Sequence, residues 1–156
     1  MLFRSDIEHI RSQNDKKPIK KADKKDWLDD IESLNLEALI NIDKEDIIED
    51  KQSEAFNTLY ETIEKEFGED KVFDKASISN LALLDAGTNR SYKNAFFPIK
   101  RNIILQNDMN GIFIPICTRN AFVKYYTKNI QDIRTWKEED AEDYLNAIKI
   151  TLKNFP

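Results

Sequence analysis

The chain contains a single histidine, His9, and it follows an acid, Glu8, in a short segment flanked by Ile7 and Ile10. A neutral imidazole has an unperturbed pKa of ~6.5, close to working pH, which makes it a suitable proton acceptor. No second histidine competes for that role. His9 is therefore the first candidate for acid–base chemistry, although a solitary histidine is often an ordinary surface or core residue.

A second group of chemically capable residues lies between positions 78 and 101. Residues 78–84 are mostly apolar and predict a short strand, Gly87 permits a sharp turn, and Thr88 is suited to cap a helix. Amide, hydroxyl and cationic side chains then follow at Asn89, Arg90, Ser91, Lys93, Asn94, Lys100 and Arg101. A strand, a turn and a helix start crowded with such side chains form a good frame for a phosphate-handling site.

Taken together, the two stretches resemble the HNH (His-metal finger) nuclease motif. In that motif the first strand ends in an acid–His pair, the second strand carries an Asn, and the following helix carries the last ligand, His or Asn. The matching positions here are Glu8–His9, Asn80 and Asn89. Their order and spacing are most similar to the HNH-type C-terminal domain of the GmrSD-type restriction and phage-defence protein family. The resemblance covers residues 3–14 and 76–128 well and the remainder loosely.

This resemblance implies a metal-dependent endonuclease that hydrolyses phosphodiester bonds of DNA in a restriction-modification or phage-defence system. His9 would be the general base, and Asn80 would hold the backbone around it. Glu8 and Asn89 would bind Mg²⁺ or Mn²⁺, hard cations that prefer oxygen ligands, with Asp6 in reserve. The phosphate and nucleic-acid contacts would be Lys100, which we also place in the catalytic set, together with Arg90, Ser91, Lys93 and Arg101.

Two further expectations come from the same resemblance. The family module is usually fused to an N-terminal ParB-like nucleotide-hydrolysing domain, which we expect as a further domain or partner subunit. Neighbouring residues of a strand point to opposite faces, so Glu8 and His9 can share a site only if the strand end is irregular.

Composition predicts one domain over residues 1–156, with 40% hydrophobic residues and 34% charged residues. The single cysteine, Cys117, excludes an intramolecular disulfide and a cysteine zinc cluster, and we expect it to be a small core residue. No apolar run approaches the ~18 residues that a membrane span needs, and no signal peptide is visible, which favours a cytoplasmic protein. The chain carries no P-loop, G-x-G-x-x-G, G-x-S-x-G or H-E-x-x-H motif.

The net charge of −5 argues against a general nucleic-acid binder, but the charge is unevenly distributed. Residues 1–22 hold six Lys or Arg against three Asp or Glu, and residues 78–128 hold seven against two. Residues 23–77 hold seven against 18, and residues 129–156 hold four against six. Both motif segments are therefore basic, as expected for a nuclease face with an acidic back, although acidic helices with solvated faces explain the same numbers. On the nuclease interpretation, the basic residues of 90–101 and 119–128 should face the same side as His9.

The fold class expected is α+β: a mostly helical domain around a small antiparallel two-stranded hairpin and helix, with a long helical insert. Motif strand 1 falls in 3–14, the acidic insert in 23–75, motif strand 2 and its helix in 76–108, and the C-terminal helices in 118–155. Residues 6–10 should pair antiparallel with about 79–84. Within these segments, apolar spacing predicts helices over 26–34, 47–67, 99–108, 118–126 and 138–152, and a strand or extended segment over 112–116. The expected caps are Asp23 or Asp26 for the first helix, Thr118 for the fourth and a capping box over 135–138 for the last, and Gly68 should end the second.

Two other interpretations remain open. In the first, the chain keeps the HNH fold without turnover, as a DNA- or protein-binding module. In the second, it is a helical adaptor whose acidic helices bind a basic partner, which leaves the coincidence of Glu8–His9, Asn80 and Asn89 unexplained.

Overall fold

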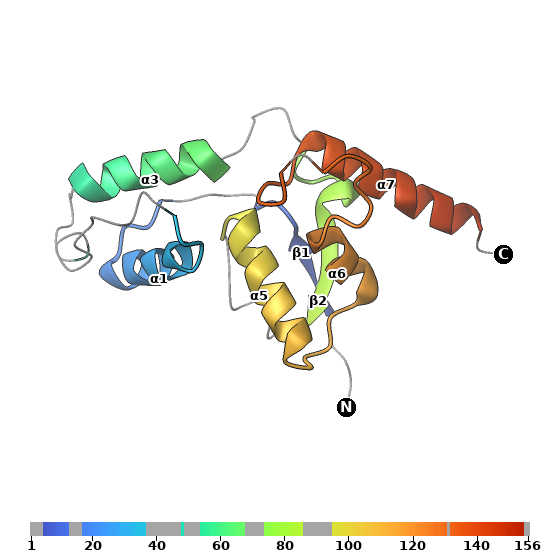
Figure 1. The fold of residues 1–156 in the computed structure, drawn as a ribbon, viewed down its shortest axis with the longest axis horizontal. Helices are drawn as coiled ribbons and strands as arrows, with labels where there is room; N and C mark the ends of the chain where they lie inside the picture. Colours follow the sequence, from blue (N-terminus) through green and yellow to red (C-terminus); the bar gives the residue numbers. More distant parts are fainter. Residues whose placement is uncertain are drawn as a thin grey trace.

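The computed structural model describes residues 5–12, 17–36, 48, 54–67, 74–85, 95–130 and 132–154. These ranges form an α+β fold that is mostly helical (Figure 1). In chain order, the elements are β1 (Ser5–His9), α1 (Lys21–Glu32), α3 (Glu54–Phe67), the 3₁₀ turn η2 (Ile78–Asn80), β2 (Leu81–Asp85), α5 (Phe97–Met109), α6 (Ile116–Phe122) and α7 (Glu138–Lys153).

The two strands pair antiparallel and form the only sheet in the described part of the chain. Ser5 lies opposite Asp85, Ile7 opposite Leu83, and His9 opposite Leu81. The predicted pairing of the two motif strands is therefore confirmed, although α1 and α3 lie between them in the chain. One face of the sheet is buried, through Glu8, Ala82 and Leu84, while Ile7 and Leu83 on the other face are exposed.

The second strand begins three residues later than the sequence pattern suggests. Ile78 does not extend into the strand, because residues 78–80 turn as η2. The Ser77 hydroxyl accepts a hydrogen bond from the backbone N–H of Ser79, and the Ser77 carbonyl accepts one from Asn80. Ser and Asn side chains commonly stabilise such turns, which the apolar pattern alone does not reveal.

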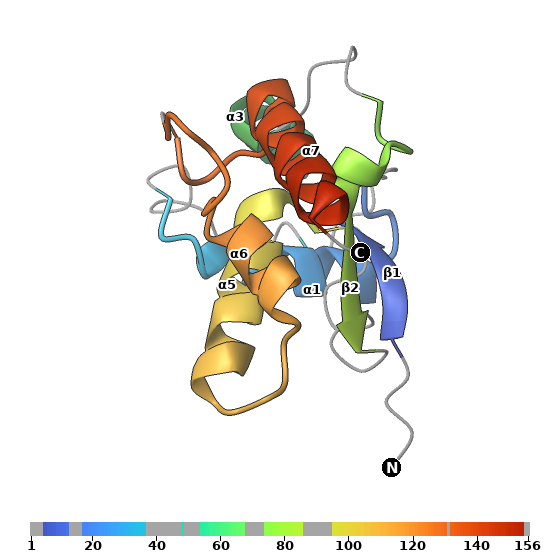
Figure 2. The ribbon, with the colours of Figure 1, turned by 90° about the vertical axis from the view of Figure 1, so that its right-hand side faces the viewer.

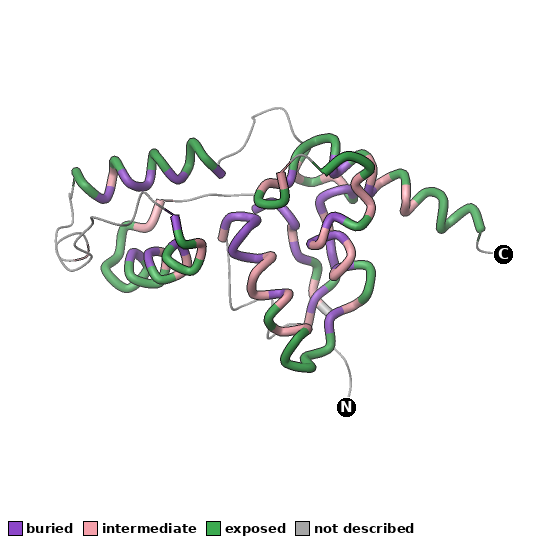
Figure 3. Tube along the Cα trace, in the orientation of Figure 1, coloured by how far each residue is buried: buried purple, intermediate pink, exposed green. Residues whose placement is uncertain are grey.

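Two clusters of buried side chains share α5 as their common wall. One cluster packs the sheet, α6 and α7 around Phe97, Ile104 and Phe122. The other packs α1 and α3 against Phe96 and Ile99. Figure 1 accordingly shows α5 between the α1–α3 pair and the two strands, and Figure 3 shows its buried residues gathered mainly in its first half.

The predicted helices at 26–34 and 47–67 are found in part. Helix α1 begins at Lys21, earlier than expected, and its N-cap is Lys20, without a side-chain cap hydrogen bond, in place of Asp23 or Asp26. Leu28 and Ile31 face the core as the helical spacing predicts. Helix α3 ends at Phe67, next to the expected stop at Gly68, and its described part begins at Glu54.

The C-terminal part of the fold departs further from the expected pattern. Helix α5 matches the prediction, and Gly111 adopts the positive φ of 78° expected at a turn. Residues 112–115 form no strand, and Pro115 rather than Thr118 is the N-cap of α6. The capping interaction of α7 is also displaced, because the Lys137 backbone N–H donates to Asp140 at 2.8 Å. Thr135 instead donates to Asp132.

Helix α7 buries side chains in the core through its first half, and Ile148 in its second half packs against the same cluster while partly buried. Ala141 and Tyr144 are buried, and the helix lies against η2 at one end of the strands (Figure 2). The end of the helix, residues 149–153, is exposed, as the run of exposed residues toward the C-terminus in Figure 3 shows. The helix expected after Gly87 and the first part of the predicted 47–67 helix, Ile48 excepted, lie outside the described residues.

Candidate functional site

His9 is the last residue of β1, and the chain that follows it is fixed to the start of β2. The Ile10 backbone N–H donates to the Asn80 carbonyl at 2.8 Å. The Ser12 hydroxyl donates to the Ala95 carbonyl at 2.8 Å, which ties the same segment to the start of α5. His9 itself is partly exposed, so its imidazole lies at a rigid strand end with access to solvent.

The side chain of Asn80 forms the tightest part of this connection. It is fully buried, its Oδ1 accepts from the Arg11 N–H at 2.8 Å, and its Nδ2 donates to the Arg11 carbonyl at 2.9 Å. Nδ2 also donates to the Lys75 carbonyl at 3.0 Å. A single amide therefore holds two segments that lie 69 residues apart in the chain. The expected contact of Asn80 with the backbone beside His9 is observed.

Lys100 occupies a different position from the one the sequence suggests. Its side chain is only 1% exposed, and its ammonium donates to Glu8 Oε1 at 2.5 Å and to the His9 carbonyl at 2.6 Å. Lys100 therefore does not face solvent as a phosphate contact. It lies beneath the sheet and connects the Glu8 carboxylate to the backbone of His9.

Glu8 and His9 point to opposite faces of β1, because the strand stays regular through His9. The irregular strand end needed to bring both side chains into one site is therefore not found. Glu8 is buried and paired with Lys100, whereas His9 lies on the more open face.

Partial burial of the ring lowers the pKa of His9 from its ordinary value. The Glu8 carboxylate acts in the opposite direction and raises this pKa, while the Lys100 ammonium lowers it further. The imidazole is therefore neutral at neutral pH, the state in which it can accept a proton.

The described residues do not by themselves provide a ligand set for a divalent metal. No group of three or more His, Cys, Asp or Glu side chains in these ranges is arranged to hold an ion. Glu8, the expected carboxylate ligand, has its Oε1 on Lys100 and faces away from His9. Asn89, the other expected ligand, lies outside the described residues, as do Arg90, Ser91 and Lys93.

Most described basic residues of segment 78–128 are neutralised by nearby acids. Besides Lys100, three others are ion-paired: Arg119 with Asp108 at 2.6 Å, Lys124 with Asp140 at 2.8 Å, and Lys128 with Asp143 at 3.1 Å. The expectation of a free basic face over residues 119–128 is therefore not met. Arg101, expected as a nucleic-acid contact, is partly buried and has no ion pair with any described residue.

Some contacts that organise the site carry no signal in the sequence. Thr118 donates to the Leu83 carbonyl at 2.6 Å and accepts from the Leu83 N–H at 3.2 Å, so α6 satisfies the outer edge of β2. The Ser12 hydrogen bond joins residues 83 positions apart in the sequence, and the two Lys100 hydrogen bonds join residues 91 and 92 positions apart. No local periodicity reports such distant partners. Cys117, expected in the core, is exposed.

Comparison with known proteins identifies no relative: no family model, no curated protein and no solved structure matches the chain. In the described ranges, no helix has the length and apolar character needed to cross a membrane.

Proposed function

We propose that the chain is an HNH-type endonuclease domain that hydrolyses phosphodiester bonds of DNA with the help of Mg²⁺ or Mn²⁺. The observation that carries this proposal is the junction of the two motif strands. The HNH resemblance requires residues near positions 9 and 80 to meet, and Asn80 hydrogen-bonds Ile10 and Arg11 directly after His9. A restriction or phage-defence system is the setting that the resemblance implies.

In this proposal His9 accepts the proton of the attacking water, because its pKa is lowered and its ring is partly exposed. Asn80 and Lys100 are positioning residues, which fix the backbone that carries His9. Arg90, Ser91, Lys93 and Arg101 contact the phosphates. Asn89 and Glu8 are the proposed metal ligands, and Glu8 can serve only if its carboxylate leaves Lys100.

The proposal extends to a partner. A ParB-like nucleotide-hydrolysing domain or subunit would deliver the substrate to this domain.

A second candidate is a catalytically inactive HNH-fold module that binds DNA or protein. The Glu8–Lys100 ion pair favours it, because a carboxylate neutralised by a buried ammonium is a poor metal ligand. The two candidates differ in one measurable property, which is metal-dependent turnover.

A plasmid-nicking assay separates them. The wild-type chain is expected to nick supercoiled DNA with Mg²⁺ or Mn²⁺ and to stop when EDTA removes the metal. His9→Ala should lower the rate by roughly 10²–10⁴-fold, the usual worth of a positioned proton acceptor. Its melting temperature and DNA affinity should stay near those of the wild type, because His9 lies outside both core clusters.

Equal cleavage by wild type and His9→Ala would rule out His9 as the base. Metal-dependent DNA binding without any cleavage, with or without the ParB-like partner, would favour the inactive module.

A further inference from the structure

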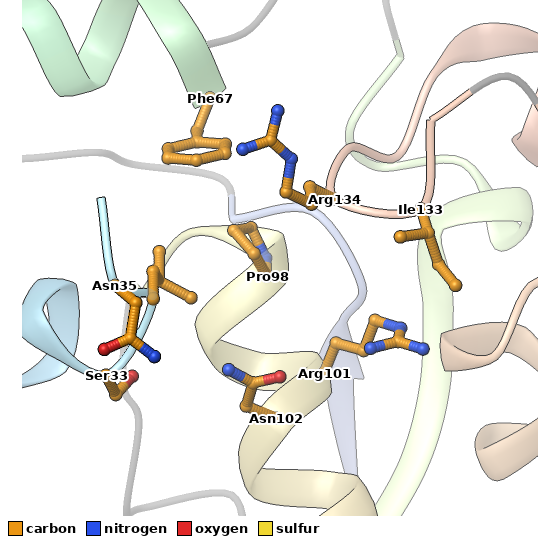
Figure 4. Close-up of a pocket in the computed structure, with 9 residues that line it drawn as sticks. Ser33, Asn35, Phe67, Pro98, Arg101, Asn102, Ile133 and Arg134 are labelled. Carbon is orange, nitrogen blue, oxygen red and sulfur yellow. The ribbon is translucent and has the colours of Figure 1, made fainter. Parts of the chain in front are cut away.

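A pocket of about 290 Å³ lies beside the start of α5. The end of α1, the end of α3, the start of α5 and residues 133–134 form its walls, as Figure 4 shows. Phe67, Pro98 and Ile133 supply apolar surface, and Arg101, Asn102 and Arg134 supply polar groups. Its volume is at the lower end of the range of ligand pockets, ~300–1,000 Å³, so it suits a small ligand.

Arg101 is the unusual member of this pocket. Its Nε is buried and forms no hydrogen bond, and within the described ranges it has no acidic partner. The other four described basic residues of segment 78–128 each have one. Burial also lowers the pKa of Arg101. A partly desolvated cation without a counter-charge favours an anion more strongly than a solvated one.

Arg134 is already partly compensated. Its guanidinium lies over the Phe67 ring at 5.6 Å, 3.1 Å from Glu66 and 3.8 Å from Asp132. Figure 4 shows it beside Phe67, while the Arg101 side chain extends toward Ile133. Arg101 is therefore the main contact for an anion. Arg134 adds a second guanidinium at the pocket, which its contacts with Phe67, Glu66 and Asp132 hold in place.

The side chain of Asn102 lies one residue beyond Arg101 on α5 and has no hydrogen-bond partner among the described residues. Its amide can donate to an oxygen of an anion or bond to an uncharged polar group. The pocket thus combines an uncompensated guanidinium, a free amide and apolar walls.

We propose that this pocket binds an organic phosphate ester, with the phosphate at Arg101 and the organic part against the apolar walls. A planar guanidinium fork suits phosphate oxygens, and the volume leaves room for a group beyond the phosphate itself. The ester is either a free nucleotide or a nucleotide unit of a nucleic-acid strand. The site uses none of Glu8, His9 and Asn80, and it shares with the nuclease proposal only Arg101, which is a phosphate contact in both; binding measured without metal therefore tests it separately from cleavage.

The test is isothermal titration calorimetry on the full chain in EDTA, so that no metal-dependent step contributes. The probes are dTMP, inorganic phosphate, uncharged thymidine and an unphosphorylated oligothymidylate. Binding of dTMP with little or no binding of thymidine is expected. If dTMP binds more tightly than the oligonucleotide, the source is a free nucleotide; the reverse order indicates a strand.

Arg101→Gln should weaken binding by about 10-fold or more, because it removes a charge-assisted contact. Arg134→Gln should weaken it less, since Glu66 and Asp132 already compensate that charge. Arg119→Gln is the matched control, because Arg119 pairs with Asp108 and does not line the pocket. Arg101→Lys keeps the charge but loses the planar guanidinium, so its affinity should lie between those of the wild type and Arg101→Gln. It also tests the proposal if Arg101→Gln does not fold.

The proposal is overturned if neither phosphate probe nor the oligonucleotide binds at concentrations up to ~10 mM, the weakest range of specific binding. Equal binding of thymidine and dTMP would overturn it too, as would wild-type affinity in both Arg101 variants. A failure of plasmid nicking leaves this result unaffected.

Discussion

At the scale of single residues, the site depends on charges arranged around one histidine. His9 carries a lowered pKa that results from burial and from the opposing influences of Glu8 and Lys100. As the only histidine of the chain, it can be titrated without ambiguity. The acid limb of any His9-dependent rate should therefore fall below the ordinary imidazole value of ~6.5.

Lys100→Met tests this electrostatic arrangement. Removing the ammonium removes an influence that lowers the pKa of His9 and leaves Glu8, which raises it. The pKa should rise, so His9 stays protonated to a higher pH and the acid limb of nicking moves to higher pH. The measurement is an NMR titration of the His9 ring protons, together with the pH profile of nicking.

Lys124→Met is the control for that experiment, because it also removes a buried, ion-paired lysine but does not contribute to the pKa of His9. An unchanged or lower pKa of His9 in Lys100→Met would contradict the arrangement described.

Asn80 gives a second prediction, which concerns stability. Asn80→Ala removes three buried hydrogen bonds and leaves backbone groups of Arg11 and Lys75 without their observed partner. Each unsatisfied buried group costs ~1–3 kcal/mol, and three backbone groups lose their Asn80 partner, so the free energy of unfolding should drop by at least about 3 kcal/mol. Urea denaturation measures this drop, and Asn146→Ala, at an exposed position on α7, should change little. A loss below about 0.5 kcal/mol, the size of an ordinary surface substitution, would argue against the role of Asn80 as the connection between the two strands.

At the scale of elements, the sheet has only two strands, and α6 completes one of its edges. A two-stranded hairpin is marginal by itself, so packing against helices is needed to hold it. Thr118 supplies part of that packing by bonding both backbone groups of Leu83. An unpaired strand edge is otherwise open to pairing with another chain.

Thr118→Val keeps the shape of the side chain and removes both hydrogen bonds. We expect a loss of ~1–2 kcal/mol in unfolding free energy, the range for removing a hydrogen bond while its partner stays in place. Hydrogen exchange at the Leu83 amide should become faster, while exchange at Ile10, which bonds Asn80, should change less. Unchanged protection of Leu83 would show that α6 does not hold this edge.

At the scale of the whole molecule, fewer positive charges of segment 78–128 are available to bind an anionic partner than the number of Lys and Arg residues suggests. Four of its five described cations are bound to acids, two of them in buried pairs. Nucleic-acid binding, if present, must draw on cations that are not neutralised in this way.

The salt dependence of DNA binding follows from this distribution. A double variant with Arg90→Gln and Lys93→Gln should reduce the slope of log K for DNA binding against log salt concentration by about 1.8. Each phosphate that the protein neutralises adds roughly 0.9 to that slope. Arg119→Gln with Lys128→Gln removes the same charge from residues already paired with Asp108 and Asp143, and the slope should change much less. Equal changes in the two double variants would contradict this distribution of available charge.

The sequence determined the main elements and the pairing of its two motif strands. Apolar spacing located α5 and the buried faces of α1 and α3, and the Glu8–His9 and Asn80 positions predicted which segments meet. The helical faces depend on local periodicity, which a sequence displays directly, whereas the strand pairing was expected from the HNH resemblance.

The tertiary structure alone decided how the side chains of these segments are used. The sequence suggested that Lys100 is a surface cation. In the structure its ammonium instead donates hydrogen bonds to Glu8 and to the His9 carbonyl. Thr118 looked like a helix cap and became the partner of a strand edge 35 residues away. The sequence suggested a basic face at Arg119, Lys124 and Lys128. In the structure, acidic residues of α5 and α7 form ion pairs with all three. Charge pairing and hydrogen bonding depend on distances in space, and these are set only when distant segments pack together.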